Sequence, residues 1–233
     1  MCGRFSLAKE AKAIQKALAM FDIDEMIQPR YNIAPTQPVV TVLNHAIGGK
    51  KGRTTFTQWG LIPYWAKDPK IAYNMINARS ETAHEKPSFK GPFKRKRCIL
   101  IADGYYEWRK VTGSSLKQPV YYRMKQHVPF ALAGLWDEWH DGGGGLHMTS
   151  TILTCRPNDL AQLVHPRMPC ILRAEDYEAW LDPHFDDIPE LKKMLEPYPS
   201  KEMESYEVET IVNRATNDVP ACIVPKPQQQ DLL

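Results

Sequence analysis

Short runs of β-branched and aromatic residues recur along most of this chain, and they constrain its fold more than any other feature. Each run is bounded by Gly, Pro or charged residues, which favour turns. The runs lie at residues 39–44, 54–59, 98–103, 105–110, 119–124, 130–136 and 150–155. They do not alternate with long helical segments, which disfavours a doubly wound parallel sheet. We expect an α+β fold with a curved, mainly antiparallel, barrel-like β core and peripheral helices.

Three helices and one late strand complete the expected elements. Residues 8–21 place apolar side chains at helical spacing among strong helix formers. Further helices are expected at 174–181 and 189–196, and a strand at 206–212. The four glycines at 142–145 predict a hairpin tip rather than a phosphate loop, because neither Lys-Ser nor Lys-Thr follows them.

The length and the cysteines bound the class of protein. The 233 residues suit one large domain or two small ones, and we expect one domain over 1–225 and a disordered tail over 226–233. The five cysteines are odd in number and lack a C-x-x-C pair, so neither a disulfide framework nor a zinc site is indicated. We expect no metal or cofactor. No apolar run approaches the length of a membrane span, which favours a cytoplasmic protein.

Charge is unevenly distributed along the chain. Residues 175–209 hold twelve acidic residues against three lysines, although the whole chain carries a net charge of +3. The remainder is therefore basic, most densely at 84–97. A polyanion is one candidate partner for this run, and a solvated turn is the alternative.

Cys2 is an unusual placement for a cysteine. A small residue after Met1 normally permits removal of Met1, which leaves an α-amine and a thiol on the same residue. Such a 1,2-aminothiol forms a Schiff base with an aldehyde and closes through sulfur to a thiazolidine. With a pKa of about 7.7 to 8.0, a substantial fraction of the amine is neutral near pH 7. The alternative is that Cys2 is inert.

Two further segments carry candidate polar residues. Asn77 follows an apolar approach and opens a polar segment, so its amide is expected at a strand end, aimed into a cleft. The alternatives are that Asn77 satisfies a turn and that Arg79 pairs with Glu81. His165 lies in a proline-stiffened loop after the 150–155 run. A single His is more often a surface or packing residue.

Glu107 lies in an aromatic segment, Tyr105-Tyr106-Glu107-Trp108. Alternation along a strand puts Glu107 on the face of Tyr105 and opposite Tyr106 and Trp108. A carboxylate among aromatic rings is partly desolvated, which raises its pKa toward the range of a general acid or base. The alternative is an exposed carboxylate on an edge strand.

Taken together, the chain resembles the SRAP family, the abasic-site processing proteins also called SOS response-associated peptidases. The resemblance is carried by blocks in family order: MCGRF (1–5), RYNIAPTQ (30–37), WGLIPYWAKD (59–68), INARSET (76–82), CILIADGYYEWR (98–109) and HPRMPCIL (165–172). It implies a single SRAP-like domain and a sensor of abasic sites in single-stranded DNA. Such a protein forms a reversible covalent thiazolidine crosslink that shields the lesion.

The resemblance also implies roles for individual residues. Cys2 resembles the nucleophile, and Asn77 the residue that positions it and senses the abasic sugar. Glu107 resembles the acid/base that handles the Schiff-base protons, and His165 the residue that helps to open the sugar ring. The family often carries an acidic residue after this His, where this chain has Pro166. The expected DNA contacts are phosphate-binding arginines and base-stacking aromatics: Arg4, Arg79, Arg167, Tyr64 and Trp65.

Two other classes of function remain open at this point. An N-terminal-nucleophile hydrolase or amidotransferase also begins Met-Cys-Gly and would form an acyl-enzyme on Cys2. A non-catalytic single-stranded DNA-binding module would use only the basic and aromatic residues. Release of Met1 is either autocatalytic, as the peptidase label suggests, or left to an aminopeptidase. We expect a cytoplasmic monomer that associates with the nucleoid when bound to DNA.

Overall fold

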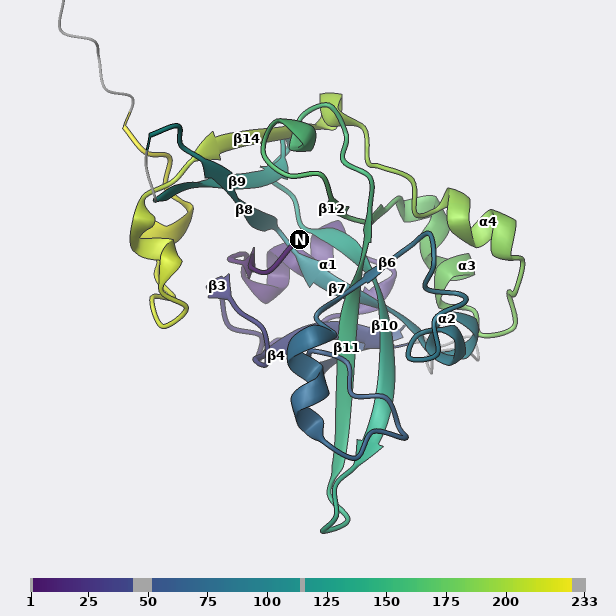
Figure 1. Cartoon of the computed structure of the whole chain (residues 1–233). Helices are drawn as coiled ribbons and strands as arrows, with labels where there is room; N and C mark the ends of the chain where they lie inside the picture. Colours follow the sequence, from purple (N-terminus) through teal and green to yellow (C-terminus); the bar gives the residue numbers. More distant parts are fainter. Residues whose placement is uncertain (1, 44–51, 114–115, 228–233) are drawn as a thin grey trace, which may run out of the picture.

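The computed structural model describes residues 2–43, 52–113 and 116–227 (Figure 1). Within these residues each of the seven runs between 39 and 155 forms a strand; residue 44, the end of the first run, lies outside them. The strands are β4 (Pro38–Leu43), β5 (Gly52–Trp59), β7 (Arg97–Ala102), β8 (Gly104–Lys110), β9 (Lys117–Met124), β10 (Phe130–His140) and β11 (Leu146–Cys155). β10 and β11 extend past their apolar runs and meet at the glycine-rich tip, where Asp141 N donates to Gly145 O (2.9 Å). The hairpin predicted there is confirmed.

One sheet closes into a barrel. β5, β4, β7, β10 and β11 pair antiparallel in that order, and β11 returns to pair parallel with β5. Buried hydroxyls reinforce the closure, because Thr57 Oγ1 lies 2.8 Å from Thr41 Oγ1 and 2.7 Å from Ser150 Oγ. The expected curved, mainly antiparallel core is confirmed.

A second, smaller sheet carries the start of the chain. Its order is β14 (Met203–Glu207), β9, β8, β1 (Phe5–Leu7) and β3 (Arg30–Ile33), all antiparallel. Short strands extend the barrel sheet: β2 (Phe21–Asp22), β6 (Asn77–Arg79), β12 (Met168–Pro169) and β13 (Ile171–Leu172). Of these, β2 pairs parallel with β5 and β6 parallel with β11.

Helices cover the outside of the core (Figure 1). The α-helices are α1 (Ala11–Ala17), α2 (Lys90–Arg95), α3 (Tyr177–Leu181) and α4 (Ile188–Lys193). The 3₁₀ helices are η2 (Pro69–Asn74), η3 (Ala161–Leu163), η4 (Ala174–Asp176), η5 (Ser200–Glu202), η6 (Thr210–Asn213) and η7 (Pro220–Ile223). No helix in the described ranges is long and apolar enough to cross a membrane.

Two predicted elements need correction. The helix expected at 8–21 ends at Ala17, because Leu18 leaves helical geometry and Phe21 pairs with Gly52 as part of β2. The strand expected at 206–212 begins earlier, as β14, and its second half is the 3₁₀ helix η6. Of the predicted tail, residues 228–233 lie outside the described residues, whereas Lys226 N still donates to Glu207 O (2.8 Å).

The basic run at 84–97 is not uniformly a surface feature. Lys86, Lys90 and Lys94 are exposed, but Arg97 is only 1% exposed. Its guanidinium donates to the backbone carbonyls of Phe93 in α2 and Trp180 in α3, at 2.8 and 2.6 Å. Arg97 therefore joins α2 and α3 to the barrel and does not face a partner.

Candidate active site

The start of the chain is held inside the molecule by β1. Phe5 pairs with Tyr105 of β8 on one side and with Ile33 of β3 on the other. Cys2, which precedes this strand, is fully buried, and its thiol donates to Arg4 O at 3.8 Å. Burial raises the pKa of the Cys2 thiol well above its usual value, so sulfur needs a nearby base before it reacts as a nucleophile.

Asn77 connects a second segment to Cys2. It is the first residue of β6 and pairs with Ile152 of β11. Its side-chain Nδ2 donates to the backbone carbonyl of Cys2 at 2.8 Å. The amide predicted at a strand end thus lies against Cys2, where it fixes the backbone that carries the α-nitrogen and the thiol of that residue.

Glu107 shows the alternation predicted for its segment. Tyr105 belongs to the main core cluster, whereas Tyr106 and Trp108 pack in a separate cluster on the other face of β8. Glu107 is 5% exposed, and burial raises its pKa to about 7. On the same face of β8 and β9, the rings of Tyr105 and Tyr122 stack with centroids 4.8 Å apart. Glu107 can therefore both release and accept a proton near neutral pH.

His165 lies beside Glu107, with Nδ1 3.9 Å from Oε1 of the carboxyl. The backbone N–H and the carbonyl oxygen of Arg167 are each 3.1 Å from the same Nδ1. The loop backbone thus contacts the ring although Pro166 replaces an acidic neighbour. Burial lowers the pKa of His165, which favours the neutral imidazole at neutral pH.

The four predicted catalytic residues therefore come together from four separate segments. The burial of the Cys2 thiol and the negative charge of Glu107 both disfavour ionisation of that thiol, so the two groups lie in one electrostatic environment. The arrangement offers a nucleophile, a carboxyl that titrates near pH 7, a neutral imidazole and an orienting amide. Among the described residues, no group of three His, Cys, Asp or Glu side chains is placed to hold a metal ion.

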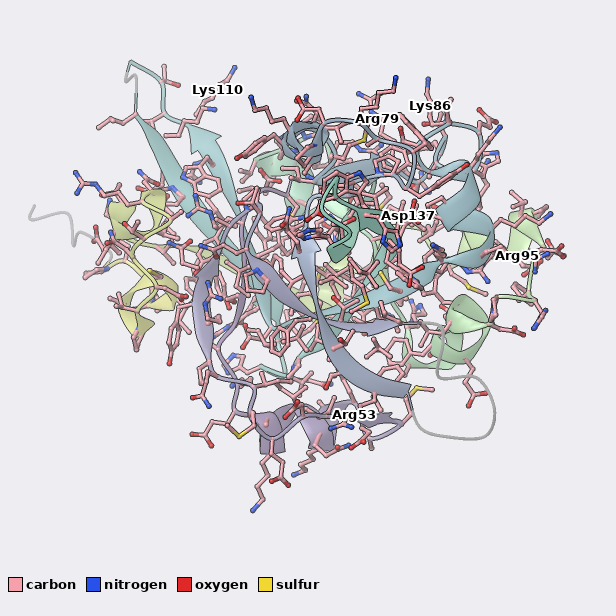
Figure 2. All side chains as sticks on the ribbon, turned by 90° about the horizontal axis from the view of Figure 1, so that it is seen from below. Arg53, Arg79, Lys86, Arg95, Lys110 and Asp137 are labelled. Atoms are coloured by element: carbon pink, nitrogen blue, oxygen red, sulfur yellow. The ribbon has the colours of Figure 1, made fainter. Side chains whose placement is uncertain are left out.

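The residues predicted to contact DNA differ in how accessible they are. Tyr64 and Trp65 are 74% and 49% exposed, in the loop that leads through η2 into β6. Arg79, at the end of β6, is also exposed. Figure 2 shows Arg79 and Lys86 at the same edge of the molecule.

The two remaining arginines already have protein partners. Arg4 Nη1 donates to Asn32 Oδ1 (2.7 Å) and Val212 O (2.8 Å). Arg167 forms a bidentate ion pair with Glu81, in which Nη1 donates to Oε1 at 2.6 Å and Nη2 donates to Oε2 at 2.8 Å. Glu81 therefore pairs with Arg167 and not with Arg79, the partner considered from sequence.

Asp137 is a supporting residue that the sequence did not single out. It is 2% exposed, accepts the backbone N–H of Tyr64 at 3.0 Å, and accepts a hydrogen bond from Lys96 Nζ at 2.8 Å. It anchors the loop that carries Tyr64 and Trp65 to β10. The available signal was an acidic residue directly after the apolar run at 130–136, which is costly to bury without partners.

A family model and the sequences of known relatives identify the same family. The family model for "SOS response associated peptidase (SRAP)" matches residues 1–215. The "Abasic site processing protein YoqW" of Bacillus subtilis is 42% identical, over 96% of this chain and 99% of that protein. The "Abasic site processing protein HMCES" of Gallus gallus is 31% identical, over 97% of this chain and 78% of that protein.

A solved structure shares the fold as well. The crystal structure of a protein from Bacteroides thetaiotaomicron superposes with a TM-score of 0.83 at 28% identity, covering 97% of this chain and 100% of that one. The chain belongs to the SOS response associated peptidase (SRAP) family.

Proposed function

We propose that this protein processes abasic sites in single-stranded DNA by capturing their aldehyde on Cys2 as a thiazolidine. The observation that carries the proposal is the convergence of Cys2, Asn77, Glu107 and His165 in one site. The names of the relatives support the same lesion as substrate. The enzyme class we propose is a crosslinking, lyase-like enzyme.

The chemistry begins with the sugar. An abasic sugar is an electrophile only when its ring is open, and we assign the opening to His165. The neutral imidazole accepts the proton of the C1′ hydroxyl as the bond from C1′ to O4′ breaks, and returns it to O4′. The product is the free C1′ aldehyde.

Capture then proceeds through nitrogen and sulfur in turn. The neutral α-amine of Cys2, freed by removal of Met1, adds to C1′. Glu107 gives its proton to the resulting hydroxyl, which leaves as water, so a protonated Schiff base and a carboxylate form together. The carboxylate takes the thiol proton while Sγ adds to C1′ and closes the ring. The net change is one thiazolidine and one water, and the reverse sequence consumes that water to release the aldehyde.

Each supporting residue has a physical reason for its role. The pKa of about 7 lets Glu107 act as acid in one step and base in the next. The hydrogen bond from Asn77 to the Cys2 carbonyl holds the aminothiol in place. Tyr64 and Trp65 are exposed for base stacking, and Arg79 for a phosphate. Arg4 and Arg167 would reach phosphates only by exchanging their protein partners.

The cysteines bear on the cellular compartment that we propose. All five cysteines are free and buried, which suits a reducing compartment. We propose a cytoplasmic monomer that joins the nucleoid through DNA. Met1 is removed either by the site itself or by an aminopeptidase, and mass spectrometry of Glu107→Gln and His165→Ala proteins made in aminopeptidase-deficient cells would separate these routes.

The test is a denaturing gel with abasic and intact single-stranded oligonucleotides. We expect a 1:1 adduct with the abasic strand alone, lost in Cys2→Ala and kept in the control Cys98→Ala, which removes another buried thiol. Acetylation of the mature amine should also abolish the adduct. A normal yield of adduct from the acetylated protein would contradict the thiazolidine mechanism. An acyl-enzyme on Cys2, formed with an ester substrate, would favour the hydrolase. Salt-reversible binding to DNA without a covalent adduct would favour a non-catalytic binding module.

A further inference from the structure

An ion pair joins the loop that carries His165 to the segment after β6. Arg167 Nη1 and Nη2 donate to the two carboxylate oxygens of Glu81 at 2.6 and 2.8 Å. Arg167 Nη2 also donates to the backbone carbonyl of Thr154. The Arg167 side chain is 17% exposed and that of Glu81 49%. Two parallel hydrogen bonds fix the orientation of a guanidinium more firmly than one contact.

Glu81 itself is held in a defined position. Arg79 pairs with Thr154 in the parallel ladder between β6 and β11, and Ser80 N donates to Thr154 O at 2.9 Å. Ala83 N donates to Arg79 O at 2.9 Å, which closes a turn directly after the strand. The same short segment therefore holds Cys2 at its start, through Asn77, and Arg167 just past its end.

Arg167 in turn determines what His165 can donate. Its backbone N–H lies 3.1 Å from Nδ1 and donates to it only in the tautomer whose Nδ1 is unprotonated and whose Nε2 carries the proton. Its carbonyl oxygen lies equally close to Nδ1 and accepts from it in the other tautomer. A small displacement of the Arg167 backbone therefore changes which ring nitrogen bears the proton. It also changes the 3.9 Å separation of the ring from Glu107.

We propose that Glu81 is a positioning residue, which through Arg167 fixes the orientation and tautomer of His165 beside Glu107. This inference rests on the proposed function, since it assigns to Glu81 an effect on the reaction only by way of His165. It also gives Arg167 a structural task in the free protein. The competing role for Glu81 is that of a phosphate substitute, which blocks Arg167 until DNA displaces it.

The variant Glu81→Gln separates the two roles, because it removes the charge and keeps the shape. In single-turnover assays we expect adduct formation and release both to slow by about ten- to a hundredfold, the scale of effect for a displaced catalytic group. Noncovalent affinity for DNA, measured with Cys2→Ala in the background, should not change. The ¹⁵N resonances of the His165 ring should move, since the tautomer population changes. Glu85→Gln, a neighbouring carboxylate that is 66% exposed and pairs with His84, is the matched control and should leave all readings unaltered.

Several outcomes would overturn the proposal. Tighter DNA binding with normal rates and an unmoved His165 spectrum would make Glu81 a phosphate substitute. Normal values for every reading would give it no role in the site. If Glu81→Gln lowers the melting temperature strongly, Arg167→Lys is the second variant. It keeps the positive charge but cannot form the bidentate hydrogen bond, so the ¹⁵N resonances of the His165 ring should move. Unmoved resonances in Arg167→Lys would also overturn the proposal. A wild-type protein without any adduct would refute the proposed function, whereas the ring resonances would still report on Glu81.

Discussion

Glu107 is almost fully buried, and this burial raises its pKa to about 7, close to neutral pH, where it can act as a proton donor and acceptor. Glu107→Gln keeps the shape but cannot carry a proton. We expect single-turnover rates of adduct formation and of release to fall by about 10²- to 10⁴-fold, the usual loss on removing a general acid/base. DNA affinity should hardly change. Unchanged rates with an unchanged melting temperature would refute the role assigned to Glu107.

The same residue makes stability depend on pH. Burial raises the pKa of Glu107 from its ordinary value of 4.5 to about 7, so the folded protein binds this proton more readily than the unfolded chain. The contribution is fully present below pH 4.5 and is lost as the pH rises through about 7, a change on the order of 3 kcal/mol. Urea denaturation at pH 5 and pH 8 measures it, and the pH dependence of wild type should exceed that of Glu107→Gln. Equal dependence in both proteins would mean that Glu107 is not the group responsible.

At the level of single residues, sequence predicted what depends on local pattern. Alternation placed Glu107 on the face of Tyr105, and the motifs of the family resemblance selected four residues that the fold brings together. The pairing of Glu81 with Arg167 could not be predicted, because 86 residues separate them and they meet through the pairing of both β6 and β12 with β11. Arg97 was misplaced for a related reason. A basic run contains no local signal that one of its members turns inward to cap backbone carbonyls.

Among the elements, the loop that precedes β6 has the clearest link to DNA. Tyr64 and Trp65 are exposed in this loop, and Asp137 fixes its backbone by accepting the N–H of Tyr64. Base stacking on an aromatic side chain contributes about 1–3 kcal/mol, so Tyr64→Ala or Trp65→Ala should weaken DNA binding by about five- to 150-fold each. The melting temperature should change little, because both side chains are exposed. Fluorescence anisotropy with Phe56→Ala as control, an aromatic that is 50% exposed on β5, tests this, and an equal loss in the control would indicate a nonspecific effect.

Long strands were predictable and short ones were not. Runs of apolar residues mark β4, β7 and β10, whose side chains are buried on both faces. β1, β3 and β6 have three or four residues each, too few to show a period, and their pairing partners lie far along the chain. The helix predicted at 8–21 was too long, because local propensity favoured helix beyond the residues that form it. Helix propensity continued past Ala17, but the parallel pairing of Phe21 with β5 required an extended chain.

For the whole molecule, charge is the property that most affects encounter with DNA. Lys86, Lys90 and Lys94 are exposed on and before α2, and Figure 2 shows Lys86 at the edge that also carries Arg79. Arg53 is labelled on the opposite side of the molecule in the same view. Sequence identified the basic run, whereas only the fold shows that its exposed members follow β6, which starts at the proposed site.

The salt dependence of binding tests this arrangement. If Arg79 and the three lysines each neutralise one phosphate of a single strand, the logarithm of the association constant should fall with the logarithm of salt concentration at a slope of about −3. Replacing Lys86, Lys90 and Lys94 together by Ala should bring the slope to about −1, because three of the four released counterions are lost. Replacing Lys12, Lys16 and Arg53, which are also exposed, removes the same charge elsewhere and should leave the slope near −3. Binding to an abasic oligonucleotide, followed in the Cys2→Ala background so that no adduct forms, provides the measurement. An equal change of slope in both triple variants would mean that net charge, and not a defined track for the strand, governs binding; a wild-type slope near zero would remove phosphate contacts from the interface altogether.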